Sequence, residues 1–282
     1  MASFNTPKII ENNQIYDSSK HNFRPLLEIK EAWQYRDLVF FLVRRDITAR
    51  YKRSVLGIAW TMLNPLGMMI VLSIVFSQVF RVAMENYPAY VLSGIIVWTF
   101  FSQTSANSIS VMVWGGDLFQ RIYIPRSIFA ISTVFTGLVN LVLSLVPLIL
   151  VMLVTKVPIS LTILLVPISM LLVAMFSLGI GLLLSTIGIY FADIVEMYAI
   201  VLTAWMYLTP IIYPLSILPE WVQSWLQLNP MVHLVEIFRS FVFYGKIPAI
   251  EVWLIGFGLS LVTFLIGWFA FTEKSDEFAY RT

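Results

Sequence analysis

The chain has 282 residues, of which 59% are hydrophobic and 12% charged, and its formal net charge is +2. Soluble domains carry roughly 25% charged residues, so this composition excludes an ordinary soluble domain and indicates a membrane protein. The small net charge gives no reason to expect a nucleic-acid partner. The chain contains no cysteine, which excludes disulfides and thiolate sites.

Residues 1–53 are polar and basic and lack the apolar core of a signal peptide, so the first span is expected to act as the insertion signal. Within this region the sequence predicts an amphipathic interface helix whose apolar side follows helical spacing. Its residues are Tyr35, Leu38, Val39, Leu42 and Val43, with Arg44 and Arg45 on the polar side. The alternative is a simple continuation of the first span into the cytoplasm.

Six segments of the chain carry no charged residue and exceed the roughly 18–20 residues that a helix needs to cross the hydrocarbon core. They are 54–80, 86–116, 127–155, 157–192, 197–219 and 252–272. We therefore expect an all-α membrane protein with six transmembrane helices. The predicted division is a cytoplasmic region over 1–53, a six-span domain over 54–272 and a cytoplasmic tail over 273–282.

The segment between the fifth and sixth spans is different in kind. Residues 221–235 are uncharged but too short to span. Pro214 and Pro219 precede them, and Pro230 lies within them. This pattern predicts a re-entrant segment over about 214–230 rather than a seventh span.

The basic residues predict the orientation. Cytoplasmic loops carry the excess of Lys and Arg, and with six spans fourteen of the eighteen basic residues fall on the side of the N-terminus. Only Arg81, Lys156, Arg239 and Lys246 fall on the other side. Both termini are therefore expected in the cytoplasm, with membrane lipids as partners of the basic rim.

Several function classes lack the residues they need. The six charge-free segments hold no proton relay or ion site. Gly245-Lys246 does not complete a phosphate-binding loop, so the chain is not expected to bind ATP itself. Asp193 and Glu196 make only a weak metal signal, and His21 and His233 are isolated, so neither catalytic residues nor a metal site are predicted.

Two sets of residues in the second half of the chain suggest specific roles. Glu236 and Arg239 are spaced i, i+3 on a probable helix and are predicted to form a structural pair. Five aromatic residues form either an interfacial belt or the wall of a path on which sugar rings stack. They are Trp98, Tyr207, Tyr213, Trp221 and Trp225.

Three motifs, in this order, resemble a known family. "RYKRSVLGIAWTMLNPL", "QRIYIPRS" and "NPMVHLVEIFR" on a six-span frame are similar to the permease subunit of polysaccharide-export ABC transporters, which includes O-antigen, capsule and teichoic-acid exporters. The resemblance covers roughly residues 33–272. It implies a bacterial inner-membrane homodimer that binds two cytoplasmic ATPase subunits, which hold ATP and magnesium, and that exports a lipid-linked polysaccharide.

The resemblance also implies a coupling helix over about 116–126 that docks in the ATPase. The residues it assigns to this role are Asp117, Leu118, Phe119, Arg121, Tyr123, Pro125 and Arg126. One departure is the start, Gly115-Gly116-Asp117, where the family often shows a basic pair and an asparagine.

Three other functions fit parts of the sequence. An ABC exporter of a small lipid or drug would share the architecture. A membrane-embedded glycan enzyme would need catalytic carboxylates near the interface, for which Asp193 and Glu196 are the candidates. A non-catalytic membrane scaffold is the third.

Overall fold

The structure is a computed structural model that describes residues 24–52, 54–76, 84–115 and 124–274. These residues form helices and connecting segments, with no strand among them. In chain order the helices are α1 (Arg24–Gln34), α2 (Arg36–Tyr51), α3 (Ala59–Ile74), α4 (Tyr87–Trp114), α6 (Ser127–Val154), η2 (Leu161–Leu165), α7 (Val166–Gly188), α8 (Ile194–Tyr207), η3 (Leu215–Ile217), α9 (Glu220–Leu226), α10 (Pro230–Val242) and α11 (Ile250–Lys274).

The described helices follow the six charge-free segments, with differences in length. Three stretches are long and apolar enough to cross a membrane, namely α6, α11 and residues 161–188 with η2 and α7. Helices α3 and α8 are apolar but have only 16 and 14 residues. Helix α4 has 28 residues, and its second half carries many hydroxyl and amide side chains. The all-helical prediction thus stands, while six spans remain a proposal.

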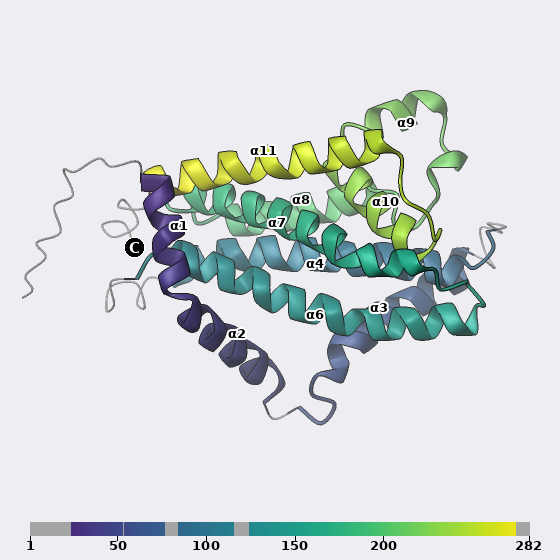
Figure 1. Cartoon of the computed structure of the whole chain (residues 1–282), viewed down its shortest axis with the longest axis horizontal. Helices are drawn as coiled ribbons and strands as arrows, with labels where there is room; N and C mark the ends of the chain where they lie inside the picture. Colours follow the sequence, from purple (N-terminus) through teal and green to yellow (C-terminus); the bar gives the residue numbers. More distant parts are fainter. Residues whose placement is uncertain (1–23, 53, 77–83, 116–123, 275–282) are drawn as a thin grey trace, which may run out of the picture.

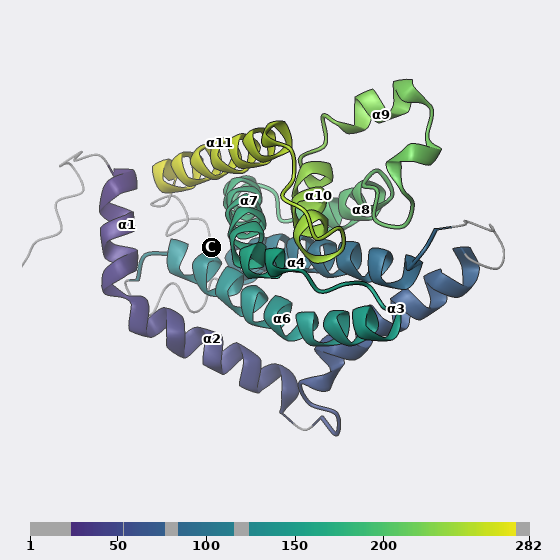
Figure 2. The same cartoon turned by 45° about the vertical axis from the view of Figure 1, so that its right-hand side comes forward.

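Helix α4 lies at the centre of the molecule (Figures 1 and 2). It packs against α3, α6, α7, α8 and α10. Its first half is buried almost without interruption from Tyr87 to Trp98. Burial of this kind needs no amphipathic pattern, because a helix surrounded by other helices presents apolar residues on every side.

Helices α7 and α11 form the most tightly packed pair. A side chain at Gly179 would meet the backbone of Thr263 and Phe264, and one at Gly267 would meet the backbone of Gly179. Small residues let two helices in a membrane approach closely, which gives them van der Waals contact along their length. The backbones of α7 and α11 are therefore in direct contact at these glycines, and we call this contact the α7–α11 seam.

Both ends of the described chain lie at the same end of the helical bundle (Figure 1). The Trp268 indole of α11 donates a hydrogen bond of 3.1 Å to the Pro25 carbonyl of α1. A second buried cluster at this end joins α2, α6 and α11 through Leu42, Phe129 and Phe271. An even number of crossings is consistent with this placement.

The chain between α8 and α11 forms short helices joined by turns. Helix α8 ends at Tyr207, well before the predicted limit at residue 219, and a turn over 208–213 precedes the short helices η3 and α9. Helix α10 then extends to Val242, beyond the predicted re-entrant limit of 230. Eleven of its thirteen residues are buried. A criterion of charge-free length does not reveal this helix, because Glu236 and Arg239 both lie within it.

Candidate functional site

The segment predicted to couple to an ATPase falls mostly outside the described residues. This applies to Asp117, Leu118, Phe119, Arg121 and Tyr123. The described part is its end, where the carbonyls of Pro125 and Arg126 accept the first backbone hydrogen bonds of α6, at 3.2 and 3.0 Å. The Arg126 side chain is 9% exposed.

The predicted interface helix corresponds to the junction of α1 and α2 and most of α2. Tyr35 lies at the junction and is exposed, whereas Val39 and Leu42 are buried against the bundle. Leu38 and Val43 pack against the same cluster. Phe40 and Phe41, which did not fit the predicted apolar side, are 71% and 62% exposed.

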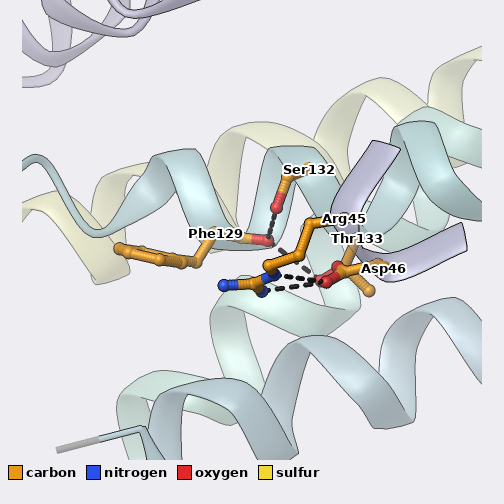
Figure 3. Close-up of polar contacts among 5 residues, drawn as sticks. All are labelled: Arg45, Asp46, Phe129, Ser132 and Thr133. Atoms are coloured by element: carbon orange, nitrogen blue, oxygen red, sulfur yellow. Dashed lines mark hydrogen bonds and ion pairs between the residues drawn. The ribbon is translucent and has the colours of Figure 1, made fainter. Parts of the chain in front are cut away.

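The end of α2 carries a pair of opposite charges beside α6. The Arg45 guanidinium lies 2.8 Å from a carboxylate oxygen of Asp46, and both residues face the first turns of α6 near Thr133 (Figure 3). Thr133 itself donates to the Phe129 carbonyl at 2.9 Å. Arg44 is exposed on the same helix.

A polar cleft opens between α2, α3, α4 and α6. It consists of two adjoining cavities of about 350 and 300 Å³. The residues that line both are Arg50, Thr99, Gln103, Asn140 and Ser144. Each volume falls at the lower end of the range for small-molecule sites. The shared lining makes the two cavities parts of one elongated cleft.

The polar residues of the cleft lie in rows along its helices, with successive members three or four residues apart; we call these rows stripes. On α4 the stripe is Thr99, Gln103, Asn107 and Ser110, and on α6 it is Thr133, Thr136, Asn140 and Ser144. Residues three or four apart lie on one face of a helix. Thr61 and Asn64 of α3 add a third, shorter stripe. Charge patterning does not reveal this site, because its signal in the sequence is uncharged amides and hydroxyls at a three-to-four-residue interval.

Two exposed amides of α4 line the cleft. Gln103 and Asn107 are exposed in the single protomer, and neither side chain has a hydrogen-bond partner among the residues that the structure describes. By contrast, the hydroxyls of Ser110, Thr133 and Ser144 donate to carbonyls of their own helices at 2.9–3.0 Å. The amides of Gln103 and Asn107 are therefore among the polar groups in the cleft that are available to a ligand.

A single glycine sets the back wall of the cleft. A side chain at Gly137 of α6 would meet Thr104 and Phe100 of α4, so the two helices touch at this level. Ser144 also approaches the Thr61 carbonyl of α3 at 3.4 Å. The cleft is thus a groove with a closed floor.

A buried arginine holds the turn after α8. Arg239 is 1% exposed and donates to the carbonyls of Pro210 and Ile211 at 2.6 and 2.8 Å. Its guanidinium carbon also lies 3.7 Å from the ring centroid of Tyr90, and the guanidinium donates to the Tyr90 hydroxyl at 2.9 Å. Gly94 makes room for it, because a side chain there would lie 2.5 Å from the guanidinium.

Two tyrosines of α4 complete this arrangement. Tyr87 donates to the Ile212 carbonyl at 2.7 Å and Tyr90 to the Tyr213 carbonyl at 3.2 Å. Together with Arg239 they satisfy four successive carbonyls of the turn. Irregular backbone is tolerated at membrane depth only when such groups are satisfied by the protein. The predicted partner Glu236 is only partly buried, and none of the five hydrogen bonds that Arg239 donates goes to it.

The first residue of the "NPMVHLVEIFR" motif anchors the other end of α10. Asn229 caps the helix by accepting from the Met231 amide at 3.0 Å, with Pro230 in the first turn. Its side chain also accepts from the Trp205 indole at 2.7 Å and donates to the Leu208 carbonyl at 3.0 Å. The motif therefore joins α10 to the end of α8.

The five aromatic residues do not gather at one place. Trp98 is 6% exposed in the core, in edge-to-face contact with Phe101 and Trp205. Tyr207, Trp221 and Trp225 are 62%, 70% and 70% exposed near the far end of the bundle. The Tyr213 hydroxyl donates to the Tyr207 carbonyl at 2.8 Å, so this residue belongs to the turn after α8.

The weak metal signal has a local explanation. Asp193 lies at the N-cap of α8 and Glu196 in its first turn, both exposed. Carboxylates are favourable at a helix N-terminus because the helix dipole is positive there. In the described part of the chain, no three His, Cys, Asp or Glu side chains form a group that could hold a metal.

Comparison with known proteins identifies the family. Residues 37–243 match the model of the ABC-2 type transporter. The chain belongs to the ABC-2 type transporter family. The match runs from the start of α2 to the end of α10. The family's membrane domain therefore includes both the polar cleft and the Arg239 anchor, by which we mean Arg239 and the carbonyls of the turn that it binds.

Relatives within the ABC-2 type family are similar over most of the chain. The O-antigen export system permease protein RfbA of Myxococcus xanthus is 33% identical over 258 residues, which cover 89% of this chain and 97% of that protein. The polysialic acid transport protein KpsM of Escherichia coli is 27% identical, with 73% and 81% covered. The capsule polysaccharide export inner-membrane protein CtrC of Neisseria meningitidis is 24% identical, with 74% and 80% covered.

Proposed function

We propose that this ABC-2 family member is the permease subunit of an ATP-driven exporter that moves a lipid-linked polysaccharide out of the cytoplasm. The observation that carries the proposal is the similarity to RfbA of Myxococcus xanthus along nearly the full length of both chains. The similarity to a polysialic acid transport protein and to a capsule polysaccharide export protein points to the same class of cargo. A relationship to exporters of O-antigen and capsule favours a glycan over a small lipid or drug.

The proposed topology has six spans in the bacterial inner membrane, with both termini in the cytoplasm. The shared location of α1 and the end of α11 supports an even number of crossings. The excess of basic residues on the side of the N-terminus supports the orientation. The turn held by Arg239 then lies toward the outside, where the re-entrant helices α9 and α10 and the exposed aromatics Tyr207, Trp221 and Trp225 stand near the exit.

A second copy and an ATPase complete the proposed transporter. One bundle of this size is too small to surround a polymer, so the path is expected between two copies related by twofold symmetry. The exposed apolar residues Ile200 and Val201 of α8, and Ile70 and Ile74 of α3, supply a surface for such contact. ATP and magnesium would be held by the partner ATPase, which touches this chain through residues 116–126 and shifts its helices between two arrangements.

Deletion and complementation test the proposed function. Removal of the gene should leave the glycan inside the cell, attached to its lipid carrier, and the intact gene should restore glycan at the surface. Unchanged surface glycan in the deletion strain would overturn the proposal. Accumulation of a small lipid in place of the glycan would support the alternative exporter and would also overturn it.

Charge reversal tests the coupling segment separately. Arg121→Glu should reduce co-purification of the ATPase, because it reverses charge at the proposed contact. The matched control is Lys246→Glu, an exposed charge reversal at the opposite end of the bundle. Equal recovery of ATPase with both variants would remove the assignment to 116–126 while leaving the exporter function standing.

A further inference from the structure

The polar cleft between α2, α3, α4 and α6 is chemically unusual for a groove on a membrane helix bundle. Amide and hydroxyl groups facing hydrocarbon without a partner are costly, because the lipid offers no hydrogen bonds. Gln103 and Asn107 project into the cleft without partners in the described structure. In the membrane, these groups require water or a polar ligand.

The lining of the cleft selects the class of ligand. Amides both donate and accept hydrogen bonds, and a hydroxyl that donates to its own helix keeps lone pairs for a second donor. Charged residues of the lining, Arg45, Asp46 and Arg50, all belong to the end of α2, where Arg45 and Asp46 neutralise each other. The deeper walls on α4 and α6 are uncharged. A neutral ligand rich in hydroxyl groups matches both features.

The length of the cleft indicates an extended ligand. The stripe on α4 from Thr99 to Ser110 is about 16 Å long at a rise of 1.5 Å per residue. The stripe on α6 runs beside it, and the first turns of α3 close one end. An acyl chain would fit such a groove in shape, but it would leave the amides of Gln103 and Asn107 without partners.

We propose that this cleft is a saccharide-binding subsite within each protomer, which receives an uncharged, hydroxyl-rich segment of the glycan in the half of the bundle that contains α2. The inference rests on the proposed export function and adds a location to it. The subsite lies on α4 and α6 and is separate from the aromatic residues of α8 and α9. Gln103 and Asn107 are its hydrogen-bonding residues, and Arg50 lines both of its cavities.

The absence of cysteine from the chain makes the subsite testable by thiol labelling. Thr99→Cys and Ser110→Cys, at the two ends of the α4 stripe, are made separately in the full chain, co-expressed with its ATPase, so that Gln103 and Asn107 stay in place. Inverted membrane vesicles are prepared from cells that make the glycan and from cells that lack the first sugar transferase. ATP is withheld so that glycan is not exported, and a membrane-impermeant maleimide measures the labelling rate.

We expect both introduced cysteines to react in glycan-free vesicles and to react about threefold more slowly in glycan-containing vesicles, the factor for a site that is two-thirds occupied. The matched control is Thr48→Cys, an exposed position on α2 that does not line the cleft, whose labelling should be equal in the two preparations.

Each other result overturns the proposal. Equal labelling of Thr99→Cys and Ser110→Cys in both preparations means that lipid or water, not glycan, occupies the cleft. No labelling in either preparation means that a second copy of the chain covers it. If deletion of the gene traps glycan inside the cell while labelling is equal, the subsite is wrong and the exporter is right. If deletion leaves surface glycan unchanged, the export function itself fails.

Discussion

The two halves of α4 use polar side chains in opposite ways. In the first half, Tyr87 and Tyr90 are buried, and their hydroxyls bond carbonyls of the 208–213 turn. In the second half, Gln103 and Asn107 are exposed to a cleft and bond no described residue. A polar group with all its partners supplied by the protein fixes a structure. One without partners is available for binding, so the two halves of one helix combine an anchor with a ligand surface.

Removal of the anchor should have the largest effect. Arg239→Met leaves the Ile211 carbonyl buried without a donor, at a cost of about 1–3 kcal/mol, and leaves the Pro210 carbonyl only the long 3.4 Å bond from the Tyr90 hydroxyl. The thermal unfolding temperature of the purified protein should fall sharply, and abundance in the membrane with it. Arg239→Lys should recover little, because an ammonium lacks the planar fork that reaches two carbonyls.

The matched control for this change is Arg44→Met, which removes an exposed arginine from α2. It should unfold at nearly the temperature of the unaltered chain. A loss of stability as large as that of Arg239→Met would show that removal of any arginine is harmful and that the anchor has no special role.

Crowding of the anchor should be the next largest effect. Gly94→Ala places a methyl group against the guanidinium of Arg239 and the backbone of Ile211, and such overpacking typically costs about 1–3 kcal/mol. Combined with Arg239→Met, the same change should cost less, because its neighbour has been removed. A double-mutant cycle on thermal stability measures this coupling. Strictly additive effects would show that Gly94 does not interact with the Arg239 side chain.

Two glycines of α11, one in the α7–α11 seam and one outside it, allow a direct comparison of glycine-to-alanine substitutions. Gly267→Ala should destabilise the bundle by about 1–3 kcal/mol, because the new methyl group meets the backbone of Gly179. Gly258→Ala, on the same helix, meets nothing within 4 Å and should be neutral or slightly stabilising. Equal stability of the two variants would contradict the close approach of these helices.

Substitution in the second half of α4 should have the smallest effect on stability. Gln103→Leu removes an amide that has no partner in the described structure, so the free energy of unfolding should stay within about 0.5 kcal/mol of the original. Thermal unfolding of the variant, measured beside Arg239→Met, gives the contrast between the two halves directly. Strong destabilisation by Gln103→Leu would mean that this amide is part of the protein's own hydrogen bonding.

The lengths and limits of the charge-free segments alone predict much of the fold. The third segment, 127–155, coincides with α6 to within one residue, because an apolar run bounded by Arg126 and Lys156 has clear limits. The fifth segment was less accurate. Its apolar run continues to residue 219, but α8 ends at Tyr207 because the chain turns back through Pro210 and Pro214, and hydropathy does not report a turn whose carbonyls are satisfied by distant side chains.

The site was harder to predict than the fold. Arg239 was recognised as a structural residue, but its partners are carbonyls and aromatic rings that lie 28–149 residues away in sequence, which no local spacing reveals. The polar stripes on α4 and α6 were visible as Thr, Gln, Asn and Ser at intervals of three or four. Their meaning depends on the two helices lying side by side, and that information is present only in the packed structure.

Binding of the cargo by the second half of α4 is best tested by the rate of glycan export in cells that carry Gln103→Leu/Asn107→Leu. The comparison is Gln227→Leu, an exposed amide at the far end of the bundle. We expect the double variant to fold, to retain its ATPase and to export about tenfold more slowly, the effect of about 1.4 kcal/mol of lost hydrogen bonding. Gln227→Leu should export normally. Export by the double variant at the original rate would contradict a role for Gln103 and Asn107 in binding the glycan.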